Sequence, residues 1–206
     1  LKVRDIASLQ TGDWIIVRSD ASADFIAEHQ MTNWWTTARQ PGPIFYRQIV
    51  SVDAETNTIA LDIPTRYALR LRDNARVYKT RAQLQGIGLE DFSIGNTEGV
   101  LPGFGEEDYS RQGTGAYEVH GAHAIAFRQA LNGWVRRIAT FKPESNTTEF
   151  HLVSNGILLN QSRSITVEDT TFENPQYRGG GGNGYGFTLQ FGDNLLAGQQ
   201  KVGVAA

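Results

Sequence analysis

Short hydrophobic segments recur at a regular interval from about residue 82 onward. Within each segment apolar and polar residues alternate, which is typical of half-buried strands. Ile125, Ile157 and Phe187 lie near the starts of three such segments, 32 and 30 residues apart. The same separations recur two positions later, at Phe127, Leu159 and Leu189. A unit of about 30 residues built from short strands and turns indicates a stacked repeat, in which each copy completes the core of its neighbour.

The first 81 residues have a different pattern, which predicts a β-rich region with one helix. Residues 14–18 read as a strand, and residues 44–52 and 59–63 read as a hairpin. Ser22 can cap a helix that continues to about Asn33. We therefore expect two regions, residues 1–81 and residues 82–206, with the first capping one end of the repeat.

Strands rather than helices account for the repeat. Helical repeats need long segments with a 3.6-residue period, and leucine-rich repeats need a Leu-x-x-Leu-x-Leu ladder, and neither occurs. A partial earlier copy at residues 89–96 aligns with residues 167–174. These observations predict an all-β fold, a parallel β-helix in which each coil consists of short strands and turns.

The same residues resemble a known superfamily. Asn155-Gly-Ile-x-Leu-x-x-Ser, followed by Ser-Ile-Thr-Val-Glu-Asp-Thr-Thr-Phe-Glu-Asn at residues 164–174, is similar to the coils of pectin-lyase-like right-handed parallel β-helix proteins. The resemblance covers roughly residues 82–198. It implies the right-handed solenoid and, as function, polysaccharide lyases, glycoside hydrolases or epimerases, but also tailspikes and adhesive surface proteins. Such proteins stack more coils than the three or four visible here, and residues 201–206 make no convincing cap, so we expect further coils beyond the chain.

Amino-acid composition limits the classes of partner and of chemistry that the protein can use. Lysine and arginine number 19 against 22 acidic residues, a net charge of −3, which gives no sign of nucleic-acid binding. No stretch approaches the roughly 18 apolar residues of a membrane span. There is no cysteine, which excludes disulfides, cysteine-ligated zinc and a cysteine nucleophile. A polysaccharide partner, as the resemblance implies, would place the protein outside the cell, secreted or on the cell surface.

The strand register predicts a polar column on one outer face of the repeat. Alternation places Ile125 and Phe127 inside and Arg128 outside. In the next two coils the same register points Leu158 and Asn160, then Thr188 and Gln190, outward. Neighbouring strands lie ~4.8 Å apart, so Arg128, Asn160 and Gln190 would form one column, with His123, Asn155 and Tyr185 beside it at the strand entries. A glycan groove and an ordinary solvated sheet face are both open interpretations.

Three long insertions would wall this groove, at residues 97–122, 142–150 and 175–184. The last contains four successive glycines, preceded by Tyr177 and Arg178 and followed by Tyr185. Tyrosine rings flanking a flexible glycine segment can stack on pyranose rings. No Lys-Ser/Thr follows the glycines, so the segment is not a phosphate loop.

Lyase chemistry fits these residue types best. β-Elimination on an acidic polysaccharide needs a neutralised carboxylate and a base at C5 of the sugar. Arginine suits a uronate carboxylate, and histidine or tyrosine can exchange the proton. We predict Arg128, His123 and Tyr185 as catalytic residues. The predicted substrate-binding residues are Asn155, Asn160, Gln190, Tyr177, Arg178 and Arg136.

The cofactor is left open, with Ca²⁺ as one possibility. Glu106, Glu107 and Asp108 could hold the ion in place of an arginine clamp, or they could be solvated loop charges. His120, His123 and His151 offer an alternative set of ligands for a transition metal.

Glycoside hydrolysis is the runner-up reaction, because it needs two carboxylates flanking the bond. The strongest local pair, Glu168-Asp169, recurs as Glu90-Asp91 at the same turn of an earlier coil, which favours a structural role for both pairs. The remaining alternatives are a non-catalytic glycan-binding or adhesive module and a structural spike domain that oligomerises.

Overall fold

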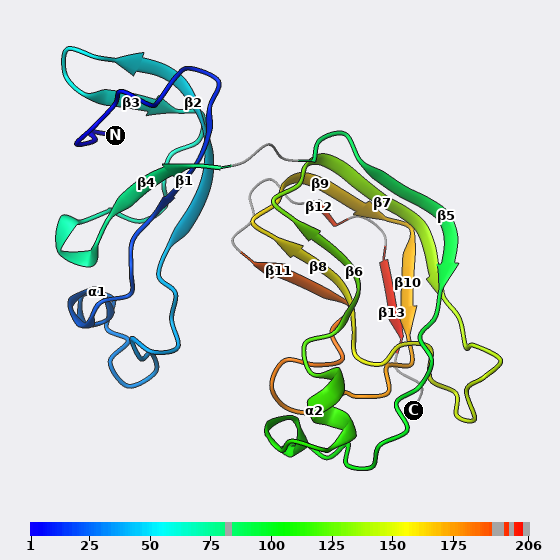
Figure 1. Cartoon of the computed structure of the whole chain (residues 1–206). Coiled ribbons are helices and arrows are strands. Elements are labelled where there is room, and N and C mark those ends of the chain that lie inside the picture. The colour runs from blue at the N-terminus through cyan, green and yellow to red at the C-terminus, as the bar shows by residue number, and fades with distance from the viewer. Residues whose placement is uncertain (81–83, 191–195, 198–199, 204–206) are drawn as a thin grey trace. The chain divides into compact units, whose positions relative to one another are not determined.

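One antiparallel sheet and two parallel sheets hold most of the regular structure, and helices are few and short (Figure 1). This computed structural model describes residues 1–80, 84–190, 196–197 and 200–203, with side chains for residues 1–80 and 84–190. The chain divides into two compact units, Leu1–Gln83 and Leu84–Ala206. Among the described residues, no helix combines the length and apolar character needed to cross a membrane.

The first unit is built on a four-stranded antiparallel sheet in the order β3-β2-β1-β4. Its strands are β1 (Trp14–Arg18), β2 (Ile44–Asp53), β3 (Thr58–Leu61) and β4 (Arg76–Lys79). The pairing of β2 with β3 confirms the predicted hairpin. Alternate residues of β1, Ile15 and Val17, lie in a core of their own with Phe45 and Ile59. Whether this unit caps the repeat stays a prediction.

The helix of the first unit begins where the sequence predicts and ends earlier. Ser22 is the N-cap, and its hydroxyl oxygen accepts a hydrogen bond from the Phe25 amide at 3.0 Å. Helix α1 spans Ala23–Glu28 and buries Phe25 and Ile26. Gln30 has φ of 58°, so the backbone leaves helical geometry three residues before Asn33. A short 3₁₀ turn, η1 (Leu71–Asp73), precedes β4.

Parallel strands from successive segments form the second unit. One sheet has the order β11-β8-β6, made of β6 (His123–Arg128), β8 (Asn155–Asn160) and β11 (Phe187–Gln190). The other has the order β12-β9-β7-β10-β13, with β5 paired to β7. Its members are β5 (Gly88–Ile94), β7 (Leu131–Thr140), β9 (Arg163–Glu168), β10 (Thr170–Glu173), β12 (Leu196–Ala197) and β13 (Gln200–Gly203).

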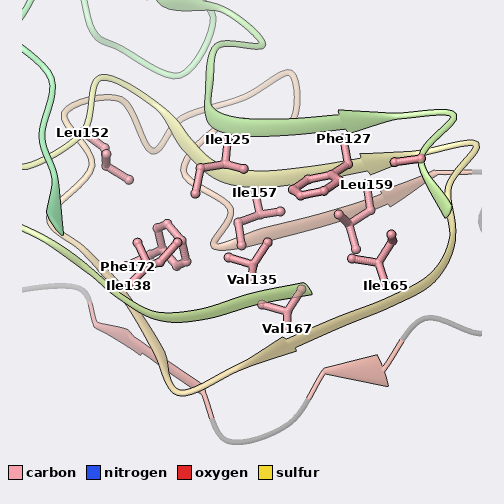
Figure 2. Packing of buried hydrophobic residues seen from close by; sticks show 11 residues of the cluster. Ile125, Phe127, Val135, Ile138, Leu152, Ile157, Leu159, Ile165, Val167 and Phe172 are labelled. Atoms are coloured by element: carbon pink, nitrogen blue, oxygen red, sulfur yellow. The ribbon is translucent and has the colours of Figure 1, made fainter. Parts of the chain in front are cut away.

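The predicted stacking of apolar residues is confirmed by the strand pairing. Ile157 pairs with Ile125 on one side and with Phe187 on the other. Side chains of both sheets meet in one buried cluster between them, in which Ile157, Ile165 and Val135 have no exposed surface (Figure 2). Leu189 keeps its register with Leu159 but is 55 % exposed, so the last described strand of this sheet is covered less than the others.

The partial early copy also aligns as predicted. Leu89 pairs with Val135, and Val135 pairs with Val167. This register buries Val135 and leaves Trp134 and Arg136 half-buried, because only alternate residues of a strand face the core.

Corner residues with a left-handed backbone recur along the parallel strands. Asp91, Arg137 and Asp169 have φ of 61°, 52° and 49°, and two further pairs, Gln129 with Gln161 and Asn132 with Ser164, have the same geometry 32 residues apart. Asp91 lies within β5 and Arg137 within β7, whereas Asp169 separates β9 from β10, so the Glu168-Asp169 pair belongs to a corner between two strands. The sequence pattern also places a turn at Asp193-Asn194 after the last repeated strand, and these two residues lie outside the described residues.

Two short helical segments occupy an insertion that the sequence suggested was only loop. Within residues 97–122 lie η2 (Asp108–Ser110) and α2 (Gly115–Val119). The Thr114 hydroxyl caps α2 by accepting from the Tyr117 amide, and Ala116 and Val119 pack on Tyr177 from the glycine-rich loop. The helix forms because its apolar side finds a partner in another loop, which local sequence does not reveal.

Candidate functional site

The predicted polar column exists on the outer side of the β11-β8-β6 sheet. Strand pairing places Asn160 between Arg128 and Gln190, and the Asn160 amide nitrogen donates to the Gln190 side-chain oxygen at 2.9 Å. Arg128 and Gln190 are exposed. The Arg128 guanidinium has no hydrogen bond or ion pair with any residue that the structure describes. The Arg128 side chain is exposed to solvent.

A second pair of amides lies next to this column. Gln129 and Gln161 follow Arg128 and Asn160 directly, and the Gln129 amide nitrogen donates to the Gln161 side-chain oxygen at 3.0 Å. Their left-handed backbone turns the chain from one sheet toward the other at this point. The polar column and the pair Gln129 and Gln161 together form a strip of hydrogen-bonding side chains at the end of β6 and β8.

His123 lies at the entry to β6. Its Nδ1 is 2.8 Å from the Gly121 carbonyl oxygen, and its Nε2 is 3.4 Å from the Thr188 hydroxyl. Since β8 separates β6 from β11, the imidazole spans β8 to reach Thr188. Burial lowers the pKa of His123 below its ordinary value, and the charge of Arg128 acts in the same direction.

Leu158 departs from the sequence-based expectation. The register points it to the outer face between Ala126 and Thr188, yet it is only 3 % exposed. This face is therefore not a bare solvated sheet at its centre. Its exposed polar positions are concentrated toward the ends of the strands, at Arg128 and Gln190.

Of the two tyrosines that flank the glycine-rich segment, Tyr185 is the exposed one. Its side chain is 54 % exposed, and its backbone amide donates to the Asn155 side-chain oxygen at 2.8 Å. Gly182 lies beside the Tyr185 ring. The flat surface of this ring is available for contact with a sugar.

Two predicted substrate contacts are buried instead, and these predictions are corrected. Tyr177 has no exposed surface, because its ring packs with Phe104 and its hydroxyl donates to the Glu106 and Gly180 carbonyls. Asn155 is 1 % exposed and uses its side-chain oxygen to hold Tyr185. In this structure both side chains are buried and hold the adjoining loops. Arg178 is exposed in the same glycine-rich loop.

Arg136 lies on the other sheet, away from the column, and this prediction is corrected too. Its guanidinium donates to Glu90 and lies over the Trp134 ring at 5.9 Å. Register places Arg136 between Glu90 and Glu168, and Arg137 makes a two-point contact with Asp91 at 2.6 and 2.7 Å. Hydrogen bonds from these arginines lower the pKa of Glu90 and of Asp91. Acidic and basic side chains thus alternate across the paired strands β5, β7 and β9 at this position.

The residues considered as possible metal ligands make other contacts in this structure. Among the described residues, no group of three or more His, Asp or Glu side chains is arranged to hold a metal ion. In the acidic segment, Asp108 instead accepts from Arg111 and from the Gly105 amide, and the bond from Arg111 lowers its pKa. His120 contacts Asn183, whereas His151 contacts Thr140.

The strands of the column carry no carboxylate. None of the residues of β6, β8 and β11 is Asp or Glu, and the pairs at Glu90 and Glu168 belong to the other sheet. The described residues of these three strands therefore provide no pair of carboxylates of the kind that glycoside hydrolysis needs.

Sequence reasoning missed two buried residues behind the site, Ser154 and Asn183. The Asn183 side chain accepts from the Ser154 hydroxyl at 2.9 Å and from the Gly121 amide at 3.0 Å. The sequence did contain a signal for Asn183. Residues 179–184 are all glycine except Asn183, so its side chain is the one polar group that this segment can use to hold its conformation. No protein-family model and no curated protein matches this chain. The functional interpretation therefore depends on the geometry of this face.

Proposed function

We propose that residues 84–190 form a right-handed parallel β-helix. The in-register pairing of Ile125, Ile157 and Phe187 supports this architecture, as do the left-handed corners that recur 32 residues apart. Crossovers between parallel strands are right-handed in nearly all proteins, which favours that hand.

We propose that the outer face of the β11-β8-β6 sheet binds an acidic polysaccharide. The observation that carries this proposal is the column of Arg128, Asn160 and Gln190, in which an exposed guanidinium without a described partner stands beside two amides. Guanidinium binds a carboxylate through two parallel hydrogen bonds, and amides bind sugar hydroxyls. Such a ligand agrees with a secreted or cell-surface protein.

The second candidate function is cleavage of that polysaccharide by β-elimination. It is favoured by His123, whose lowered pKa keeps the imidazole neutral and able to accept a proton at neutral pH. Arg128 would neutralise the uronate carboxylate while His123 takes the C5 proton. The electron pair then forms the C4–C5 double bond, the C4–O bond breaks, and the leaving oxygen takes a proton from Tyr185 or from solvent.

Binding is tested with polygalacturonate and alginate, with a neutral glucan as the control ligand. Arg128→Ala should weaken binding of the acidic chains about tenfold or more, the loss expected for one charge-assisted contact. Arg39→Ala is the matched control, since Arg39 is an exposed arginine of the first unit and the change in charge is the same. Equal affinities of the two variants would contradict the proposal.

Cleavage is tested separately, by following new absorbance at the unsaturated-uronate band. The wild-type protein should generate this absorbance, and His123→Gln should abolish it while polysaccharide binding persists. Binding without new absorbance from the wild-type protein would contradict the lyase and leave the binding module.

A further inference from the structure

A buried amide joins three loops at the entry end of the β11-β8-β6 sheet. Asn183 is only 4 % exposed, and all of its side-chain polar capacity is used. Its oxygen accepts from Ser154 and Gly121, and its nitrogen lies 2.8 Å from the Gly180 carbonyl and 3.0 Å from Nδ1 of His120. Buried polar groups bonded this completely are costly to disturb and fix local geometry.

The Asn183 side chain is connected to His123 through Gly121. Gly121 receives the bond from Asn183 at its nitrogen and contacts His123 Nδ1 at its carbonyl oxygen, 2.8 Å away. Gly121 has φ of 69°, a backbone conformation that costs glycine little. Asn183 therefore anchors the peptide before Gly121, while the Ala122 amide, in the same peptide unit as that carbonyl, donates to the Val119 carbonyl at 3.0 Å. The carbonyl is held from both sides, and Asn183 supplies one of the two anchors.

The carbonyl determines which nitrogen of His123 carries the proton. A carbonyl oxygen only accepts, so Nδ1 must be the protonated nitrogen in the contact with Gly121. In the neutral ring Nε2 then has the lone pair. Nε2 lies 3.4 Å from the Thr188 hydroxyl, whose oxygen can donate to it.

We propose that Asn183 is a positioning residue that, through Gly121, holds His123 as the Nδ1–H tautomer and presents Nε2 as a proton acceptor on the face of Arg128. The contribution of this arrangement to catalysis rests on the proposed function. The tautomer itself is a property of the protein without polysaccharide.

The surroundings of His123 agree with a neutral ring. Burial lowers the pKa of its imidazole below the ordinary 6.5, the bond to Gly121 raises it, and the charge of Arg128 lowers it again. Strands β8 and β11 carry no ionisable side chain. The adjoining loops contribute His120, which contacts Asn183, and the exposed Arg178 and Tyr185.

The test uses nitrogen NMR of the full chain labelled with ¹⁵N-histidine. The chain has four histidines, and the signals lost in His123→Gln assign His123. In the wild-type protein we expect the Nδ1–H pattern and a titration midpoint below 6.5. Asn183→Ala should convert this pattern to a mixture of tautomers and raise the midpoint, because the ring becomes better hydrated.

Asn146→Ala is the matched control. Asn146 is also a buried asparagine of the second unit, 5 % exposed, and it bonds the Asn96 and Phe150 carbonyls in a different loop. Its replacement should leave the His123 signals unchanged. If Asn183→Ala does not fold, Ser154→Ala removes one bond to the same amide and should shift the His123 signals in the same direction.

Two results would overturn the proposal. One is an Nε2–H pattern in the wild-type protein, and the other is an unchanged His123 pattern in a folded Asn183 or Ser154 variant. Both are read without polysaccharide, so they are distinct from a failure of binding or cleavage.

Discussion

At the scale of single residues, side chains of the same type differ in burial and in hydrogen-bond partners according to where they lie in the fold. Tyr177 is fully buried and donates to two carbonyls, whereas Tyr185 is 54 % exposed. Asn155 is buried and holds the Tyr185 amide, whereas Asn160 donates to Gln190 in the polar column. The sequence analysis predicted all four as catalytic or substrate-binding residues. A residue's type fixes which hydrogen bonds its side chain can form, but only the folded chain fixes which partner it finds.

Glu98 provides a residue-scale prediction for pH. Hydrogen bonds from the hydroxyls of Thr148 and Thr147 are the main cause that lowers its pKa to about 2. Since this folded-state pKa is below the ordinary 4.5, the stabilisation from the carboxylate is complete above about pH 4.5 and is lost as the pH falls toward 2. We expect the hydrogen-exchange protection of the Thr147 amide, bonded to Glu98 at 2.6 Å, to fall over that interval.

The same loop supplies the control. Glu98→Gln should reduce protection of the Thr147 amide already at neutral pH, because one acceptor oxygen is replaced by a donor group. Glu149→Gln should not, since Glu149 is a largely exposed partner of Lys142 and exposed ion pairs contribute little. Equal protection in both variants would show that Glu98 does not hold the loop.

At the scale of elements, corner residues with positive φ bend the parallel strands. Asn132 lies within β7 and Ser164 within β9, with φ of 52° and 54°, at equivalent positions of the two paired strands. A left-handed backbone costs an L-residue roughly 1–2 kcal/mol, and glycine escapes this cost. The corners recur because successive strands must turn at the same height to keep their ladders in register.

Ser164 tests this account of the corners. We expect Ser164→Val to be less stable than Ser164→Gly by about 1–2 kcal/mol, because a β-branched residue fits a positive φ poorly. Denaturant unfolding of the two variants measures the difference. A valine variant as stable as the glycine variant would mean that the corner at Ser164 relaxes without strain.

At the scale of the whole molecule, the sheets of the two units are stabilised by separate cores. One core gathers around Ile15, Val17 and Phe45, and the other gathers side chains of both parallel sheets around Ile157 and Val135. Each unit therefore has its own buried apolar cluster. Truncating a side chain in one core should therefore destabilise mainly the sheets that contribute side chains to that core.

Ile157 is the position that tests the second core. It has no exposed surface and lies between Ile125 and Phe187, so Ile157→Ala should cost about 2–5 kcal/mol. Leu189→Ala, at a position 55 % exposed, should cost much less. We expect hydrogen exchange to accelerate in β6 and β8 of the Ile157 variant and to stay unchanged in β1 and β2. Acceleration in both units would contradict two independent cores.

The sequence by itself determined the strands of the second unit, their register and the polar column. These follow from alternation and from a repeat of about 30 residues, and periodic burial of apolar side chains is encoded locally. Only the tertiary structure decided which polar residues face solvent. Tyr177 and Asn183 are buried because loops far apart in the sequence pack on one another, Asn155 is buried at the start of β8, and Arg136 pairs with Glu90 of β5. Contacts between such distant segments produce no periodic pattern in the sequence, because the conformation of each loop depends on the loop against which it packs.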